Sequence, residues 1–116
     1  MMMSAITEMQ AVELIRDYMR NIEEFRVVFA FKRMKLKPIR NTTVELMRAC
    51  IAIHDFGLPI TTKLTATICG AVQENMVSRL HTLGDRKCLL LKRSDVVRPG
   101  HALEWTIDPL FLGNYK

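Results

Sequence analysis

Residues 60–108 decide the fold of this chain. They read ITTKLTATICG (60–70), AVQENMVSRLHTLGDRK (71–87) and CLLLKRSDVVRPGHALEWTID (88–108). The first segment predicts a short helix, the second predicts another helix after a tight turn, and the third predicts a basic two-stranded ribbon. The rest of the chain is then expected to support these elements.

The two helices have clear local signals. The first should begin at Thr61 or Thr62, because either hydroxyl can accept a hydrogen bond from a free amide of the first turn. Gly70 should end it, since glycine adopts the left-handed conformation at no steric cost. In the second helix Met76, Leu80 and Leu83 share one face, which should pack on the first helix. The residues left to face outward are Val72, Gln73, Asn75, Ser78, Arg79 and Thr82.

A small residue, a turn glycine and an apolar plug follow one another at Ala66, Gly70 and Met76. Two helices that cross steeply need residues of these kinds at the crossing. The pattern resembles the helix-turn-helix signature of bacterial regulators, in which alanine, glycine and a valine or isoleucine hold these places. This chain departs from it, because Met76 replaces the branched residue and Arg79 stands where an apolar residue is usual. An ordinary helical hairpin in a core is the alternative.

The third segment carries the pattern of a hairpin. Cys88 to Leu91 is a β-prone apolar run, and Arg98-Pro99-Gly100-His101 is a turn signal. Residues 103–107 then alternate between apolar and polar side chains, which is typical of a half-buried strand. Leu58-Pro59-Ile60 is expected to add a short edge strand to this hairpin.

A cation-tipped hairpin directly after a second helix is similar to the winged helix of MarR-type and related small bacterial, phage or plasmid regulators. The resemblance covers about residues 42–108, with the wing at about 88–108. It implies a mainly α fold with a small β-hairpin (α+β), a winged helix-turn-helix with an extended N-terminal helix. It also implies sequence-specific binding of double-stranded DNA by a dimeric transcriptional regulator.

In that arrangement helix 71–83 would enter the major groove, and the wing would contact the backbone or the minor groove. Gln73, Asn75 and Ser78 are the candidates for reading base edges. Candidates for phosphate contact are Arg79, Lys63 and Lys87, with Lys92, Arg93 and Arg98 in the wing. Thr82 and His101 complete the candidate DNA-binding set.

Size and composition suit one soluble domain spanning residues 1–116. Hydrophobic residues make up 49% and charged residues 25%, which is ordinary for a globular protein. No apolar run is long enough to span a membrane, and no secretory signal is evident, so a cytoplasmic location is expected, nucleoid-associated when DNA is bound. The net charge is +5, and residues 25–40 hold six cations and no acid. Clustered cations favour a polyphosphate partner, although a basic surface can also serve solubility alone.

Signals for catalysis or metal binding are lacking in the sequence. The three cysteines, Cys50, Cys69 and Cys88, show no CxxC spacing, and they are expected to be buried reduced thiols. No phosphate-binding glycine loop or zinc motif occurs. We therefore expect no enzyme activity, no metal and no cofactor.

The N-terminal segment, residues 4–34, is expected to form one helix that supports dimerisation. Its apolar residues step by three and four from Ile6 through Met19 to Ile22. A seam of this length suggests a homodimer, with an intramolecular lid over the core as the alternative. Phe25–Phe31 fits a strand or a helix, and helix is favoured because no turn signal precedes it.

The remaining segments are a core helix and a tail. Thr42-Thr43-Val44-Glu45 is a capping box, so a helix should start there and run to Gly57. This helix is apolar on most sides, which predicts a central position, with His54 on the surface. Residues 109–116 are expected to form a short apolar tail docked on the N-terminal helix, either of the same chain or of a partner chain.

Two other functions stay open. A winged-helix module that binds another protein would use its cations for solubility only, and Glu74 in the candidate recognition helix favours this. A plasmid or phage replication or partition accessory protein would share the DNA-binding chemistry and differ only in its site.

Overall fold

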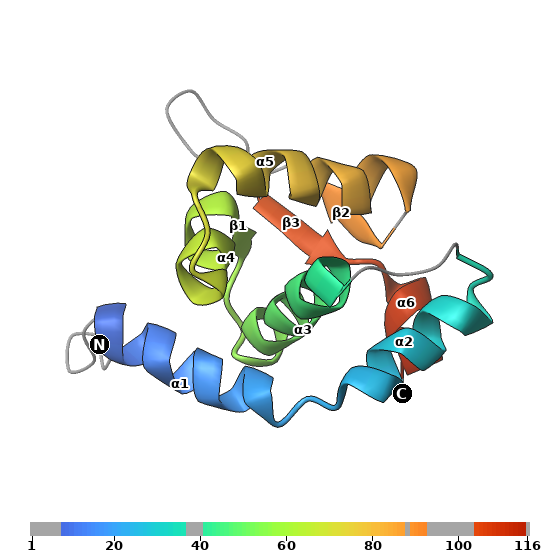
Figure 1. Ribbon diagram of the computed structural model, residues 1–116, viewed down its shortest axis with the longest axis horizontal. Coiled ribbons are helices and arrows are strands. Elements are labelled where there is room, and N and C mark those ends of the chain that lie inside the picture. The colour runs from blue at the N-terminus through green and yellow to red at the C-terminus, as the bar shows by residue number, and fades with distance from the viewer. Residues whose placement is uncertain (1–7, 37–40, 88, 93–103, 116) are drawn as a thin grey trace.

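The computed structural model describes residues 8–36, 41–87, 89–92 and 104–115, and of Glu8, Arg86 and Lys92 it describes the backbone alone. Helices dominate, and a small antiparallel sheet accompanies them, so the predicted α+β class is confirmed (Figure 1). The elements in chain order are α1 (Glu8–Arg20), α2 (Glu24–Arg33), α3 (Asn41–Asp55), β1 (Ile60–Thr61), α4 (Thr62–Cys69), α5 (Gln73–His81), the π-helical turn η2 (Thr82–Arg86), β2 (Leu90–Lys92), β3 (Glu104–Ile107) and α6 (Pro109–Tyr115).

The sheet has three antiparallel strands in the order β1-β3-β2. Ile60 lies opposite Trp105, and Leu90 lies opposite Ile107. The predicted edge strand is thus confirmed at its C-terminal end, and the predicted alternation holds, since Trp105 and Ile107 are buried and their neighbours are half-buried. The strand predicted from Cys88 begins later, at Leu90. Leu89 instead donates its amide to the carbonyl of Leu83 (2.8 Å), which ties this residue to the end of the preceding helix.

Helix α3 is the centre of the core, as predicted (Figure 1). It contacts α1, α2, α4, β1 and β3. Its start differs from the prediction, because Asn41 is already helical and both threonines of the expected capping box lie inside the first turn. His54 is exposed, as expected. The buried side chains of α3 are Val44, Leu46, Met47, Ala49, Cys50, Ile51, Ala52 and Ile53.

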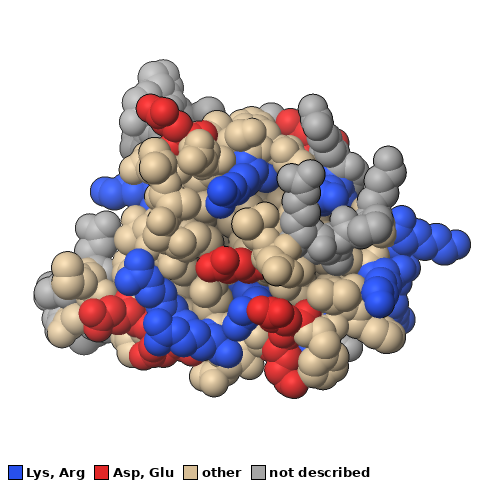
Figure 2. All heavy atoms as spheres, in the orientation of Figure 1, with Lys and Arg blue, Asp and Glu red and all other residues tan. Residues whose placement is uncertain are grey.

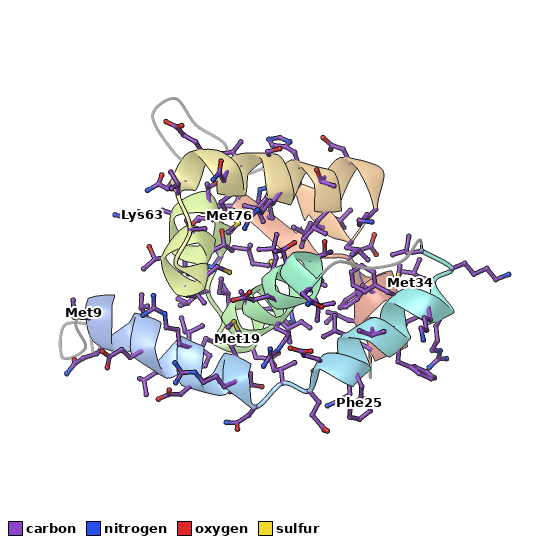
Figure 3. The ribbon with its side chains drawn as sticks, in the orientation of Figure 1. Met9, Met19, Phe25, Met34, Lys63 and Met76 are labelled. Carbon is purple, nitrogen blue, oxygen red and sulfur yellow. The ribbon has the colours of Figure 1, made fainter. Side chains whose placement is uncertain are left out.

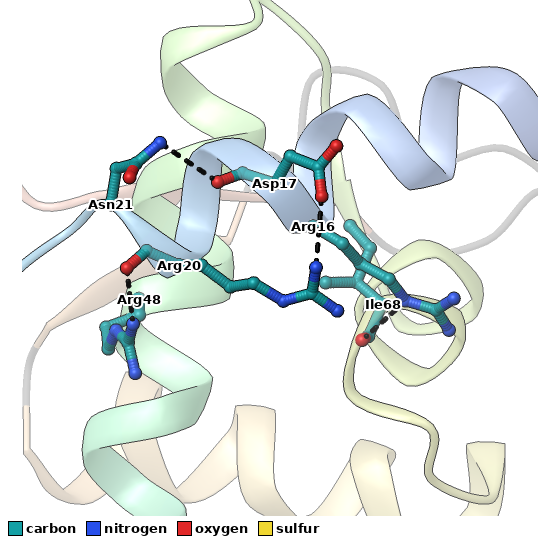
Figure 4. Close-up of polar contacts among 6 residues, drawn as sticks. All are labelled: Arg16, Asp17, Arg20, Asn21, Arg48 and Ile68. Carbon is teal, nitrogen blue, oxygen red and sulfur yellow. Dashed lines mark hydrogen bonds and ion pairs between the residues drawn. The ribbon is translucent and has the colours of Figure 1, made fainter.

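The prediction of one helix over residues 4–34 is wrong within the part described, because α1 and α2 are separate. Asn21 and Ile22 donate their amides three residues back, to Tyr18 and Met19, which closes α1 in a tight turn. Arg48 of α3 then donates to the carbonyls of Met19 (3.0 Å) and Arg20 (3.4 Å) (Figure 4). These carbonyls at the end of α1 therefore accept hydrogen bonds from a cation of another helix, which suits the negative end of a helix dipole.

The apolar seam of α1 is buried within the chain itself. Val12, Ile15, Met19 and Ile22 all belong to the core, on the side where α1 contacts α3 and α4. Burial within the chain, the intramolecular alternative, is therefore what the structure shows for these four residues. The predicted homodimer stays a prediction. Met9 is exposed, and Ile6 lies outside the described residues.

Residues 25–31 are helical, which confirms the favoured interpretation, and α2 is covered by α6. The C-terminal segment is a helix where only an apolar tail was predicted. Phe111 is buried against Phe31 in an edge-to-face pair (5.9 Å between ring centroids), and Tyr115 stacks on Phe111. Docking of this segment on the N-terminal region of the same chain is thus confirmed.

Among the residues described, no helix is long and apolar enough to cross a membrane.

Helix α5 continues into η2, whose glycine packs directly on the sheet. A Cβ built on Gly84 would lie 3.0 Å from Cη2 of Trp105 and nearer still to Cζ3. Trp105 is buried, and protein interiors are close-packed, so displacing its ring to admit a methyl group is costly. Position 84 therefore requires glycine, because any side chain there would collide with the Trp105 ring.

Gly84→Ala is expected to lower the free energy of unfolding by about 1–3 kcal/mol, because it overpacks the contact with Trp105. Gly113→Ala in α6 is the matched control, since a Cβ there meets no described atom within 4 Å. The control should raise stability by about 0.5–1 kcal/mol, because alanine favours helix over glycine. Urea unfolding of both variants checks this, and equal stability of the two would contradict the close contact.

Arg16 of α1 holds the end of α4, by donating Nε to the carbonyl of Ile68 (3.2 Å) and Nη2 to that of Thr67 (2.5 Å) (Figure 4). Arg16→Met should lower the free energy of unfolding by about 1–2 kcal/mol, because these carbonyls lose a charged donor. Arg20→Met is the control, since the one polar contact of the Arg20 side chain within the described part of the chain is an exposed ion pair with Asp17 (3.0 Å), and such pairs contribute little. Thermal unfolding separates the two, and an equal loss in both would rule out a special role for Arg16.

Candidate nucleic-acid interface

Helix α4 is bounded by the two residues that the sequence predicted. Thr61 is its N-cap, and its hydroxyl accepts the amide of Leu64 (3.1 Å). Gly70 ends the helix with a φ of 69°, in the left-handed region. The amide of Ala71 then donates a hydrogen bond to the carbonyl of Ala66 (2.9 Å), and the chain turns directly toward α5.

The packing of α5 on α4 also follows the prediction. Ala66, Met76, Leu80 and Leu83 are all buried, and Figure 3 shows Met76 on the inner side of α5, facing α4 and the core. One residue was missed: Thr65 is fully buried, and its hydroxyl donates to carbonyls in the preceding turn. Within α5, burial of one face leaves the opposite face in solvent.

The exposed face of α5 presents the predicted side chains. Gln73, Asn75, Ser78 and Arg79 are exposed, and Thr82 is half-buried at the start of η2. The Thr82 hydroxyl donates to the carbonyl of Ser78 (3.0 Å), which leaves its lone pairs free to accept. The face thus offers amide, hydroxyl and guanidinium groups on a helix held from behind by apolar contacts.

A groove runs between the second half of α5 and the first turn of α3, with a volume of about 400 Å³. It brings together Ser78, Arg79, Thr82 and Lys87, four of the predicted site residues. Thr42 and Thr43 line its other side, although their sequence context predicts only a helix cap. No local signal could have placed these threonines near Arg79, because the two segments meet only in the folded chain.

The charge around α5 is mixed. Lys63 on α4 is exposed and extends outward (Figure 3), whereas Lys87 is half-buried. Glu74 is exposed in the first turn of α5, and Asp85 lies 3.4 Å from His81. On the face seen in Figure 2, lysine and arginine side chains are interspersed with acidic ones. Of the predicted wing residues, Lys92 lies in β2 with its side chain not described, and Arg93, Arg98 and His101 lie outside the described residues.

The described thiols are poorly suited to nucleophilic chemistry. Burial raises the pKa of Cys50, which lies in the core. Burial, assisted by the Glu45 carboxylate, raises the pKa of Cys69 to about 11, and the nearby Arg79 and Arg16 only partly oppose this. Both groups are therefore protonated at neutral pH. Among the residues described, no three of the side chains His, Cys, Asp and Glu are grouped to hold a metal ion.

In comparisons with known proteins, the chain matches no family model, no curated protein and no solved structure.

The raised pKa of Cys69 predicts a loss of stability at alkaline pH. The folded thiol keeps its proton up to about pH 11, whereas the unfolded thiol loses it above its ordinary value of 9.0. The free energy of unfolding should therefore fall as the pH rises through this window. Cys69→Ser removes this group, so its stability should fall less than that of the wild type between about pH 8 and about pH 10.5 in urea titrations. An identical loss in both proteins would contradict the shift.

Proposed function

We propose that this protein binds double-stranded DNA as a winged helix, with α5 in the major groove. One observation carries the proposal: Gln73, Asn75, Ser78 and Arg79 of α5 are all exposed to solvent, while the helix is anchored through the buried Met76 and Leu80. The order α3-β1-α4-α5-β2-β3 and the sheet order β1-β3-β2 support the winged-helix assignment. Such a fold supports a recognition helix beside a β-hairpin.

Each group on α5 suits a particular contact. The side-chain amide of Gln73 or Asn75 can bind an adenine edge through two hydrogen bonds. The Ser78 hydroxyl can donate a hydrogen bond to a base acceptor or accept one from a base donor. Glu74 can accept a hydrogen bond from a cytosine amino group, whereas its negative charge opposes binding when it lies near phosphates.

Backbone contacts would come from the cations around this helix. Arg79 and Lys87 share the groove with Thr42 and Thr43, so a phosphate there would meet two cations and two hydroxyls. Lys63 would contact the strand near the start of α4. The wing residues Lys92, Arg93, Arg98 and His101 would continue these contacts along the backbone or in the minor groove. This mode of binding serves transcriptional regulation, and it would equally serve a plasmid or phage replication or partition protein.

A second candidate is a protein-binding module, and a specific feature of α5 favours it. Val72 is 62% exposed and Val77 44% exposed, so the outward surface is partly apolar. Together with Glu74, these side chains would suit a protein groove better than a polyanion. In this case the cations would act in solubility.

The test is fluorescence anisotropy with a labelled mixed-sequence duplex across a salt series. Binding should weaken linearly in log–log form, because phosphate contacts release counterions. Arg79→Ala should lower the slope by about one, and Gln73→Ala should relax sequence choice while leaving the slope unchanged. Arg20→Ala is the control, since α1 lies on the other side of α3 from α5 (Figure 1).

Two results would decide against DNA binding through α5. Failure to bind at low salt would favour the protein-binding module. Equal salt slopes for the Arg79 and Arg20 variants would show that the duplex contacts another surface. If binding is found, selection for a preferred site should recover a sequence whose readout changes in the Gln73 variant.

A further inference from the structure

The outward side of α2 carries two exposed aromatic rings. Phe25 is 65% exposed and Phe29 is 56% exposed, and they are one helical turn apart. Figure 3 shows Phe25 directed away from the body of the molecule. The opposite side of α2 packs into the core through Val27, Ala30 and Phe31, and the two exposed rings take no part in that packing. Their burial by a partner would be favourable.

The apolar surface continues from α2 onto α6. A shallow groove of about 260 Å³ lies between the two helices and is lined by Phe25, Phe29 and Tyr115, with Arg26, Arg33 and Asn114 at its edges. The guanidinium of Arg26 stands 4.5 Å from the centre of the Tyr115 ring. We call Phe25, Phe29 and this groove the α2 face. It is independent of the α1 seam, which is already buried.

Opposite charges stand at the two ends of the α2 face. Glu23 and Glu24 are at the start of α2, and Lys32 and Arg33 are in its last turn. Glu24 already pairs with Arg48 (3.4 Å) and Arg33 lies over the Phe29 ring, so Glu23 and Lys32 are the charges left for a partner. Two copies of α2 placed antiparallel would each bring their acidic end to the basic end of the other, with the phenylalanines meeting in the middle. A two-fold interface requires this kind of self-complementarity, because the same surface serves both subunits.

We propose that the α2 face is the contact between two copies of this chain, paired antiparallel about a two-fold axis. A second copy placed antiparallel matches both ends of α2 at once, acid to base and base to acid, and so fits the charges of this face. A helix of ten residues is about 15 Å long. The contact is therefore small, so the dimer is expected to dissociate at micromolar concentration. The proposal does not depend on DNA binding, and it is tested without DNA.

The first test is sedimentation velocity over a range of protein concentrations. The wild type should shift from monomer to dimer as the concentration rises. Phe25→Glu and Phe29→Glu should each raise the dissociation constant about 100-fold or more, because they bury an unpaired charge at the contact. Leu14→Glu is the matched control, since Leu14 is 51% exposed on α1 and lies outside the α2 face. A wild type that stays monomeric, or a dimer unchanged by both phenylalanine variants, would overturn the proposal.

The second test uses the charges to report the direction of pairing. Among the described residues, neither the Glu23 carboxylate nor the Lys32 ammonium group has a hydrogen-bond or ion-pair partner, and both side chains are exposed, so Glu23→Lys and Lys32→Glu should fold normally. Each variant alone should dimerise less than the wild type. Mixing the two should restore association as a heterodimer, and the double variant should dimerise again. No recovery in the mixture or in the double variant would exclude the antiparallel arrangement.

Discussion

Burial of α3 on nearly every side is the constraint on which the other elements depend. From Val44 to Ile53 most of its side chains are removed from water, and they are covered by α1, α2, α4, β1 and β3. Each of these partners contributes one apolar stripe or face, and each leaves its polar side to solvent. Arg48 is a half-buried cation on this helix: it holds the end of α1 and pairs with Glu24 at the start of α2 (3.4 Å). One side chain thus connects the core helix to both N-terminal helices.

The same core determines what α5 can do. Met76, Leu80 and Leu83 fix the helix from behind, and Gly84 lets the following π-helical turn approach Trp105. The sheet and α4 therefore hold α5 in place through its buried side chains. Its exposed side chains are not part of the core and can contact a ligand. A site on a rigid helix positions its contacts better than one on a loop. For this reason we assign recognition to α5 and dimerisation to a separate surface, the α2 face.

Local sequence signals predicted the elements whose ends are determined within one helical turn. Thr61 and Gly70 bound α4 as expected, and alternation identified β3, because each of these patterns is complete within a few residues. The break between α1 and α2 could not be predicted in this way. It depends on carbonyls that are satisfied by Arg48, a residue distant in the sequence. The seam in α1 was recognised correctly as apolar, but periodicity alone cannot tell whether a helix packs on its own chain or on another.

The candidate site was predictable to the same extent. The outward residues of α5 follow from helical spacing, whereas the groove that joins Arg79 to Thr42 and Thr43 depends on tertiary packing. The most direct measurement of the role of α5 is a nuclear magnetic resonance titration of the isotope-labelled protein with a short duplex. We expect the amide signals of Gln73–Ser78 and of the first turn of α3 to shift together, while those of α2 stay unchanged. Shifts confined to α2 and α6, or none at all, would contradict recognition through α5.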